Sequence, residues 1–169
     1  MTITTALETD EPGIIEIYNQ AVSERFRTAD TEPVSVSSRR AWFDEHRADT
    51  YPIFVHRRQT LIVGWCSLSP YRAGRQALRE VAEISYYVHR DWRGRGIGAK
   101  LVSHAVQAAP ALGLRNLLAI LLDVNTPSVR LLQKQGFIQW GHLPMIVNFQ
   151  GTLCGQYVYG RALDRPCAG

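Results

Sequence analysis

The sequence predicts a single α/β domain over residues 1–169. Three observations favour this class. The length suits one domain, and 46% apolar against 20% charged residues is typical of a chain with a buried core. Segments with strand character alternate with segments of helical periodicity. No internal repeat or Pro/Gly/Ser-rich linker interrupts them, so we expect an antiparallel meander followed by the order β-α-β-α-β-β.

The N-terminal part is expected to form one short strand and two helices. The strand covers Thr2–Ala6. The first helix opens at Pro12, because proline is favoured in a first helical turn and apolar residues then recur at helical spacing. The second helix begins at Ser37 or Ser38, since serine is a good N-cap, and it ends before Pro52.

Three strands and a long helix are expected next. The strands cover Ile53–Arg57, Leu61–Leu68 and Val81–Val88, which are rich in β-branched and aromatic residues. A helix is expected from Gly98 to Leu112, because apolar residues recur there on one helical face.

The C-terminal part predicts a buried strand, a helix and two further strands. Leu114–Val124 is apolar enough to lie in the centre of a sheet. The next helix starts at Thr126, where Asn or Thr can cap it and proline follows, and it ends at Gly136. The last strands are expected at Phe137–Leu143 and Leu153–Leu163.

A glycine-rich turn, Arg93–Gly98, lies between a predicted strand and a predicted helix. Glycine lets a backbone turn tightly and approach a ligand without a clash from Cβ. Successive N–H groups of such a turn, with a helix N-terminus behind them, form an anion site that suits a diphosphate.

The glycine-rich turn has three alternative interpretations besides a diphosphate site of this kind. A P-loop requires Gly-Lys-Ser/Thr where residues 99–101 are Ala-Lys-Leu, so the magnesium-binding hydroxyl is absent. A Rossmann fingerprint is matched formally by Gly94, Gly96 and Ala99, but residues 112–120 contain no acid and several strands precede the turn. A glycine turn without a ligand stays open.

The formal net charge of +4 is unevenly distributed. Residues 1–50 contain ten acids and five bases, a net of −5, whereas residues 51–169 contain five acids and fourteen bases, a net of +9. A basic C-terminal part predicts a polyanionic partner, which is a nucleic acid, an acidic surface or a phosphorylated small molecule. Because the chain has no basic motif interleaved with aromatic residues, no nucleic-acid partner is expected.

Several other classes of protein are not indicated. The longest aliphatic run, Leu117–Leu122, is far too short to cross a membrane, and the first residues do not resemble a secretory signal. We therefore expect a cytoplasmic protein without a membrane partner. The three cysteines and five histidines lack ligand spacing, so neither a disulfide framework nor a metal is expected; the cysteines are Cys66, Cys154 and Cys167.

Short motifs occur in order along nearly the whole chain. The arrangement Tyr86-Tyr87-Val88, the glycine turn, Asn125 and Gly136-Phe137 resembles the GCN5-related N-acetyltransferases (GNAT), which use acetyl-CoA. The resemblance is closer to their phosphinothricin N-acetyltransferase-like branch, and it rests on Ile17-Tyr18-Asn19, Glu32-Pro33-Val34-Ser35, Tyr51-Pro52, Gly64-Trp65, Ser67-Leu68-Ser69-Pro70, Glu83-Ile84-Ser85-Tyr86-Tyr87-Val88 and Gly136-Phe137.

This resemblance implies a fold and a set of cofactor contacts. The fold is one GNAT domain with a mixed sheet of about seven strands, splayed at the cofactor site and flanked by about four helices. The resemblance implies that the strand residues Tyr86, Tyr87 and Val88 bind the pantetheine arm through main-chain groups. It implies that the turn holds the diphosphate, with the residues Arg93, Gly94, Arg95, Gly96, Ile97, Gly98 and Ala99. Asn125 would contact the pantetheine from the next helix, and Lys134, one or two turns on, would lie near the cofactor more loosely. For Asn125 a helix cap is the equal alternative.

Glu83 is the candidate catalytic base. An amine attacks a thioester only as the free base, so the site needs a proton acceptor. Glu83 lies in an apolar strand segment, where burial raises the pKa of a carboxyl. The matching glutamate of the resembled branch is its proposed base. The alternative is a strand-edge glutamate paired with Arg79 or Arg75. A backbone N–H near Val88 is the candidate oxyanion donor.

Two departures from the branch concern the acyl-transfer site. Leu132 stands where relatives have His or Tyr, so the CoA thiolate must obtain its proton from water, from the ammonium group or from another residue. Residues 150–154 lack the Trp and Asp of relatives, so that side of the substrate pocket is expected to differ. Arg72 and Arg75 fall where relatives bring a cation to an acidic amino-acid substrate.

The sequence thus predicts an acetyl-CoA-dependent N-acetyltransferase. Its acceptor is a small amino acid or analogue of the phosphinothricin, methionine sulfone or methionine sulfoximine type, and transfer is direct. The alternatives are another amine, such as a protein N-terminus, a polyamine or an antibiotic, and a non-catalytic acyl-CoA sensor. A homodimer is expected, with Trp140 near a strand that joins the interface.

Overall fold

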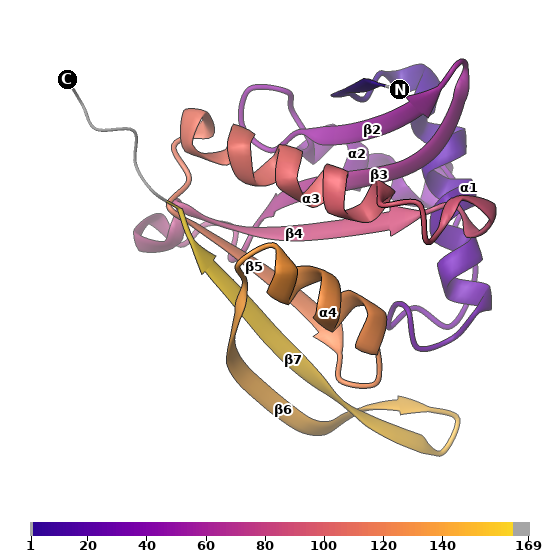
Figure 1. Cartoon of the computed structure of the whole chain (residues 1–169), viewed down its shortest axis with the longest axis vertical. Coiled ribbons are helices and arrows are strands. Elements are labelled where there is room, and N and C mark those ends of the chain that lie inside the picture. The colour runs from indigo at the N-terminus through magenta and orange to yellow at the C-terminus, as the bar shows by residue number, and fades with distance from the viewer. Residues whose placement is uncertain (1, 164–169) are drawn as a thin grey trace.

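The computed structural model describes residues 2–163 (Figure 1). Seven strands form one sheet in the order β1-β2-β3-β4-β5-β7-β6, in which β4 and β5 are parallel and all other neighbours are antiparallel. The strands are β1 (Thr2–Thr5), β2 (Ile53–Arg58), β3 (Leu61–Pro70), β4 (Val81–Val88), β5 (Asn116–Leu122), β6 (Ile138–Phe149) and β7 (Thr152–Ala162).

Four α-helices and five 3₁₀ turns connect these strands in the described part of the chain. The α-helices are α1 (Glu11–Ser23), α2 (Arg40–Glu45), α3 (Ile97–Ala108) and α4 (Thr126–Lys134). The 3₁₀ turns are η1 (Glu8–Asp10), η2 (Ser37–Arg39), η3 (Gln76–Leu78), η4 (Arg90–Trp92) and η5 (Ala109–Leu112). None of these described helices has the length and apolar character that a membrane crossing requires.

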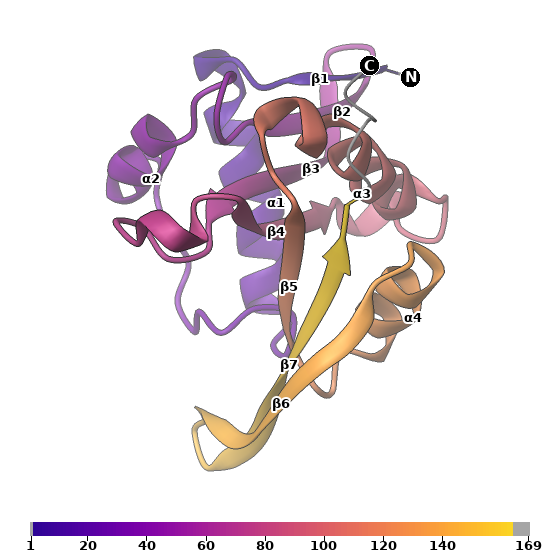
Figure 2. The same cartoon turned by 90° about the vertical axis from the view of Figure 1, so that its left-hand side faces the viewer.

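The helices cover both faces of the sheet. Figure 2 shows α1 and α2 on one side and α3 and α4 on the other. Each layer has its own core, because successive side chains of a strand point to opposite faces. On β4, Ala82 and Ile84 pack in the core beneath α3, whereas Tyr87 packs against the core beneath α1. The arrangement confirms the predicted mixed α/β fold class.

The sheet opens between its two parallel strands. β4 and β5 pair only from Val81–Asn116 to Glu83–Leu118, although β4 continues to Val88 and β5 to Leu122. Beyond these three pairs the strands diverge, as Figure 1 shows. The expected splay is therefore present, and it begins directly after Glu83.

Most element boundaries lie within about three residues of the sequence prediction, and the ends of β6 and α3 differ by more. β6 continues six residues beyond Leu143, to Phe149, because register shifts at residues 139–141 and 143–147 let the ladder with β7 continue past Pro144. The helix expected to reach Leu112 is α-helical only to residue 108, since Pro110 has no N–H and a 3₁₀ turn replaces the last helical turn.

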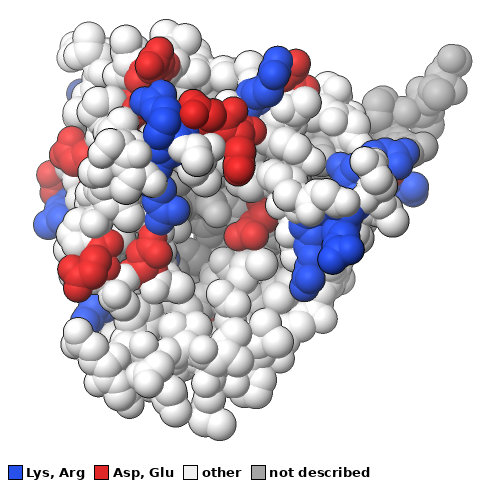
Figure 3. Space-filling view, turned by 180° about the vertical axis from the view of Figure 1, so that it is seen from behind, with Lys and Arg blue, Asp and Glu red and all other residues white. Residues whose placement is uncertain are grey.

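The two ends of the molecule differ in charge. Figure 3 views the face that α1 and α2 cover, where acidic and basic side chains surround a hollow. The lower end of this face, formed by β6 and β7, shows no charged side chain. The sequence explains this, because residues 138–160 contain no Asp, Glu, Lys or Arg.

Candidate active site

Two cavities lie beside β4 at the point where the sheet opens. The first, of about 330 Å³, is bordered by the glycine turn, β4 and the start of α4, and we call it the glycine-turn cavity. The second, of about 290 Å³, lies beneath α1 and α2, and we call it the Glu83 cavity. Tyr87 borders both cavities.

Strand alternation explains why one strand serves both cavities. Glu83, Ser85 and Tyr87 share one face of β4 and border the Glu83 cavity. Tyr86 and Val88 have the opposite orientation and border only the glycine-turn cavity. Tyr87 is the one residue that the two linings share, so the two cavities adjoin at the open end of the strand.

The glycine turn leaves main-chain donors available at the start of α3. Gly94 and Gly96 have φ angles of +73° and +75°, and a Cβ built on either would meet no atom within 4 Å. Gly96 is the N-cap of α3 and contributes no side-chain cap. The N–H groups of the first helical turn therefore lack an intrahelical acceptor and face the cavity. This arrangement suits an anion such as a diphosphate.

Gly98 has a different role from the other two glycines. A Cβ on Gly98 would lie 2.9 Å from Cδ1 of Leu131. The missing side chain therefore lets α3 approach α4 closely, and this contact shapes the floor of the glycine-turn cavity.

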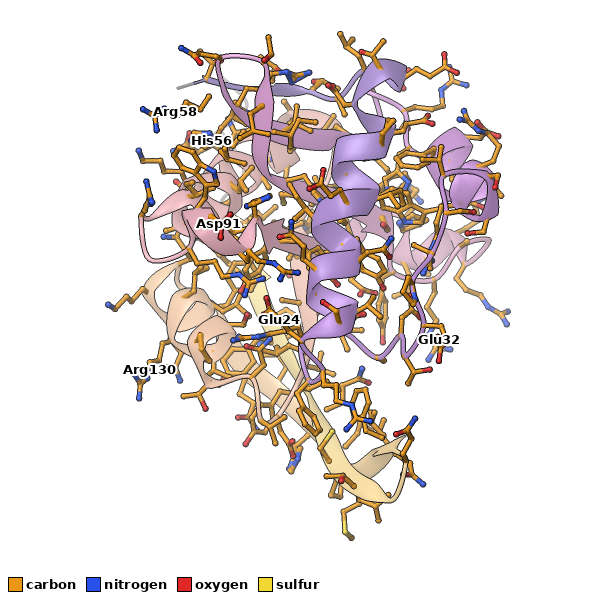
Figure 4. All side chains as sticks on the ribbon, turned by 90° about the vertical axis from the view of Figure 1, so that its right-hand side faces the viewer. Glu24, Glu32, His56, Arg58, Asp91 and Arg130 are labelled. Atoms are coloured by element: carbon orange, nitrogen blue, oxygen red, sulfur yellow. The ribbon has the colours of Figure 1, made fainter. Side chains whose placement is uncertain are left out.

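The arginines of the turn are held by local contacts. Arg93 borders the cavity, donates from Nε to the Val88 carbonyl at 3.1 Å and forms an ion pair with Glu24. Figure 4 shows Glu24 at the end of α1, near the turn. Arg95 donates to the Asp91 carbonyl at 3.1 Å, with its guanidinium over the ring of Trp92, and it is absent from the cavity lining.

The remaining sequence-predicted cofactor residues divide into two groups. Asn125 is 7% exposed, borders the cavity and caps α4 by accepting from the Ser128 N–H, so both interpretations of this residue fit its position. Lys134 is the last residue of α4, exposed and outside the cavity lining. Leu132 is buried in the core beneath α4.

Sequence reasoning missed one cation of the glycine-turn cavity. Arg27 borders it and donates from Nη1 to Oδ1 of Asn125 at 3.3 Å. The two residues are 98 positions apart, so no local spacing could have indicated the contact. Arg27 follows α1, and only the folded chain brings it to α4.

Glu83 is the acidic group of the second cavity. Burial raises the pKa of its carboxyl above the usual range. The side chain of Glu83 forms no hydrogen bond or ion pair with any residue in the described range 2–163. The alternative of pairing with Arg79 does not occur, because Arg79 pairs with Glu80. A carboxyl that is half-buried, unpaired and open to a cavity is available to accept a proton.

Aromatic side chains form much of the wall of the Glu83 cavity. The centroid of the Trp65 ring lies 4.8 Å from that of Tyr87 and 5.9 Å from that of Trp42. The ring centroids of Tyr18 and Tyr87 are 5.1 Å apart. Burial and a hydrogen bond to Asp30 raise the pKa of Tyr18 to about 12. Trp42 and Trp65 thus pack against each other and also border the site.

The sequence-predicted substrate arginines lie elsewhere. Arg72 and Arg75 are exposed, and neither borders the Glu83 cavity or the glycine-turn cavity. The guanidinium of Arg72 lies over the ring of Tyr71. The cation that does border the Glu83 cavity is Arg39, at the end of η2.

No metal site is found in the described part of the chain. Its His, Cys, Asp and Glu side chains form no group of three or more that could hold a metal ion. Cys66 and Cys154 are free and buried, and Cys167 lies outside the described residues.

A splayed sheet with a glycine turn that suits an anion on one side and an unpaired carboxyl on the other is the arrangement expected of an N-acetyltransferase. The model of the acetyltransferase (GNAT) family matches residues 14–137. The chain belongs to this family.

Individual relatives match almost the whole chain. YwnH of Bacillus subtilis is 35% identical over 165 residues, which cover 97% of this chain and 100% of the relative. The L-methionine sulfoximine/L-methionine sulfone acetyltransferase of Pseudomonas aeruginosa is 33% identical and covers 81% of this chain and 80% of its own length. A phosphinothricin acetyltransferase from Sinorhizobium meliloti, solved in complex with AcCoA, has a TM-score of 0.90 at 27% identity, covering 99% of this chain and 91% of that one.

Proposed function

We propose that this protein transfers the acetyl group of acetyl-CoA to the amino group of a small amino acid or analogue, of the methionine sulfone, methionine sulfoximine or phosphinothricin type. The observation that supports this most strongly is the unpaired Glu83 carboxyl in a cavity that meets the glycine-turn cavity at Tyr87. The names of the relatives from Pseudomonas aeruginosa and Sinorhizobium meliloti support the same class of acceptor.

The glycine-turn cavity fits the acetyl-CoA donor. In this proposal the amides of residues 93–99 bind the diphosphate, and Arg27 adds a positive charge beside them. Main-chain groups of Tyr86, Tyr87 and Val88 bind the pantetheine arm along the open edge of β4, where β5 supplies no pairing. Asn125 contacts the arm from the start of α4.

Glu83 acts as the general base in this proposal. The acceptor ammonium gives a proton to Glu83, directly or through water, and the free amine attacks the thioester carbonyl carbon. A C–N bond forms, the C–S bond breaks and CoA leaves as a thiolate, which takes up the second proton that the nitrogen loses, directly or through water. A raised pKa suits this role, because the carboxylate then holds the proton more firmly than an exposed glutamate does. The N–H near Val88 donates to the developing oxyanion.

Thiol release measured with acetyl-CoA across candidate amines tests the function. Methionine sulfone, methionine sulfoximine, phosphinothricin, common amino acids and polyamines form the panel. We expect release with the first three. Release only with polyamines or with peptide N-termini would replace the acceptor class, and calorimetric binding of CoA without release on any amine would identify a sensor.

We also propose a cytoplasmic homodimer in which residues 1–169 form one domain. The free cysteines within residues 2–163 support a reducing compartment. The uncharged β6–β7 end supports the dimer, because large apolar side chains on it are exposed and a second copy can cover them. These exposed side chains are Ile138 (65%), Trp140 (48%), Leu143 (44%), Met145 (69%), Ile146 (55%) and Leu153 (53%).

A further inference from the structure

The lining of the Glu83 cavity contains one cation and one anion. Arg39 and Glu83 are its two charged residues, and the other lining side chains are serines, isoleucines and aromatic residues. A free α-amino acid contains one carboxylate and one ammonium group. The cavity therefore matches the charges of a zwitterion, whereas a polyamine or a simple amine would leave Arg39 without a partner charge from the substrate.

Contacts with neighbouring side chains hold the Arg39 guanidinium in place and leave some of its N–H donors without an acceptor. Its Nη2 pairs with Asp30, and its Cζ lies 5.5 Å from the centroid of the Tyr18 ring. Asp30 in turn accepts from the Tyr18 hydroxyl at 2.6 Å. Within residues 2–163 the Arg39 side chain forms no other hydrogen bond or ion pair, so Nε and Nη1 remain free to donate.

Partial burial makes this guanidinium a stronger candidate for binding an anion than Arg72 or Arg75 is. The Arg39 side chain is 33% exposed. Arg72 and Arg75 are exposed and lie outside the cavity lining. A charge-assisted hydrogen bond is stronger where solvent is partly excluded, and the arginine fork can bind both oxygens of a carboxylate.

We propose that Arg39 binds the α-carboxylate of the acceptor amino acid, so that its amino group is presented to Glu83. This inference rests on the proposed function and adds a specificity determinant to it. Arg39 makes the free carboxylate a requirement of the acceptor. The protein then discriminates free amino acids from their amides and from the corresponding decarboxylated amines.

The test compares L-methionine sulfone with its carboxamide in the thiol-release assay. Wild-type protein is expected to prefer the acid in kcat/KM. In Arg39→Gln the KM for the acid rises about ten- to a hundredfold, the magnitude of a lost charge-assisted hydrogen bond. The KM values for the amide and for acetyl-CoA stay unchanged. Arg39→Lys keeps the charge without the fork and is expected to lie between the two.

Two further variants make the result specific. Arg47→Gln is the matched control, because Arg47 is exposed, pairs with Asp49 and lies outside the cavity, and it is expected to keep the wild-type acid-to-amide ratio. An equal loss for acid and amide in Arg39→Gln, or collapse of the ratio in Arg75→Gln instead, would overturn the inference while leaving the proposed function intact. Wild-type protein that acetylates neither compound would instead overturn the proposed acceptor class.

Discussion

Glu83 and Tyr87 lie four residues apart on one face of β4, and both border the Glu83 cavity, while Tyr87 also borders the glycine-turn cavity. The β4–β5 ladder ends at Glu83, so the strand between these two residues is the first part of the open edge. The candidate proton acceptor, Glu83, and the residue that borders both cavities, Tyr87, thus lie on a single strand. This geometry favours direct transfer between two bound substrates.

A methyl group added to the glycine turn is expected to weaken donor binding. In Gly96→Ala the new Cβ occupies open space at the border of the glycine-turn cavity. Alanine is also strained at a φ of +75°, by about 1–2 kcal/mol. The KM for acetyl-CoA should rise severalfold. Gly74→Ala is the matched control, since Gly74 has a φ of +77°, similar open space and no place in the cavity. Equal KM values in the two variants would argue against the turn as the donor site.

Loss of the Arg27 charge is expected to reduce donor affinity and its dependence on salt. Arg27→Gln removes the cation beside Asn125, so we expect about a threefold to tenfold weaker CoA affinity in calorimetry at low salt. The difference from wild type should shrink at high salt. Arg130→Gln is the control, because Arg130 on α4 is exposed and outside the cavity (Figure 4). A similar loss in both variants would show a general charge effect.

The dimer proposal predicts that a charged side chain introduced at the uncharged β6–β7 end lowers the mass of the particle in solution. Ile146→Lys is expected to convert a particle of twice the chain mass into one of a single chain mass in light scattering, because a lysine there is desolvated in the interface. Gln107→Lys adds the same charge to an exposed position of α3 and should leave the mass unchanged. A wild-type protein of single-chain mass would contradict the dimer.

Glu83 is expected to reduce stability at neutral and alkaline pH. Its pKa is raised in the folded state, so the folded chain binds the proton more tightly than the unfolded chain does. Stability therefore falls as pH rises past the unfolded pKa, and the loss is complete above the folded pKa. Glu83→Gln should have a higher melting temperature than wild type at pH 8, with the gap closing toward pH 4. Glu32→Gln, at an exposed position, should show no such gap.

The local features of the site could be predicted from the sequence. The strand Val81–Val88 and the glycine turn after it are contiguous, and their patterns depend on neighbouring residues only. The end of α3 before Pro110 was predicted wrongly, as a helix that reaches Leu112, although the missing N–H of the proline explains it locally.

The walls of the site could not be predicted in this way. Arg27 and Arg39 come from the segment between α1 and α2, and Trp42 comes from α2 itself; they reach the site only because the folded chain brings these segments beside β4. No spacing in the chain relates Arg39 to Glu83. The resemblance to relatives predicted a substrate cation at Arg72 or Arg75, whereas the lining of the Glu83 cavity contains Arg39.

The measurement that tests the account most directly is turnover of Glu83→Gln as a function of pH, alongside calorimetric binding of acetyl-CoA. The account predicts donor binding equal to wild type and a fall in kcat of about a hundredfold or more, the contribution of a general base. In wild type kcat/KM rises as Glu83 loses its proton, and in the variant this rise disappears. Full turnover of Glu83→Gln with an unchanged pH profile would contradict the central claim.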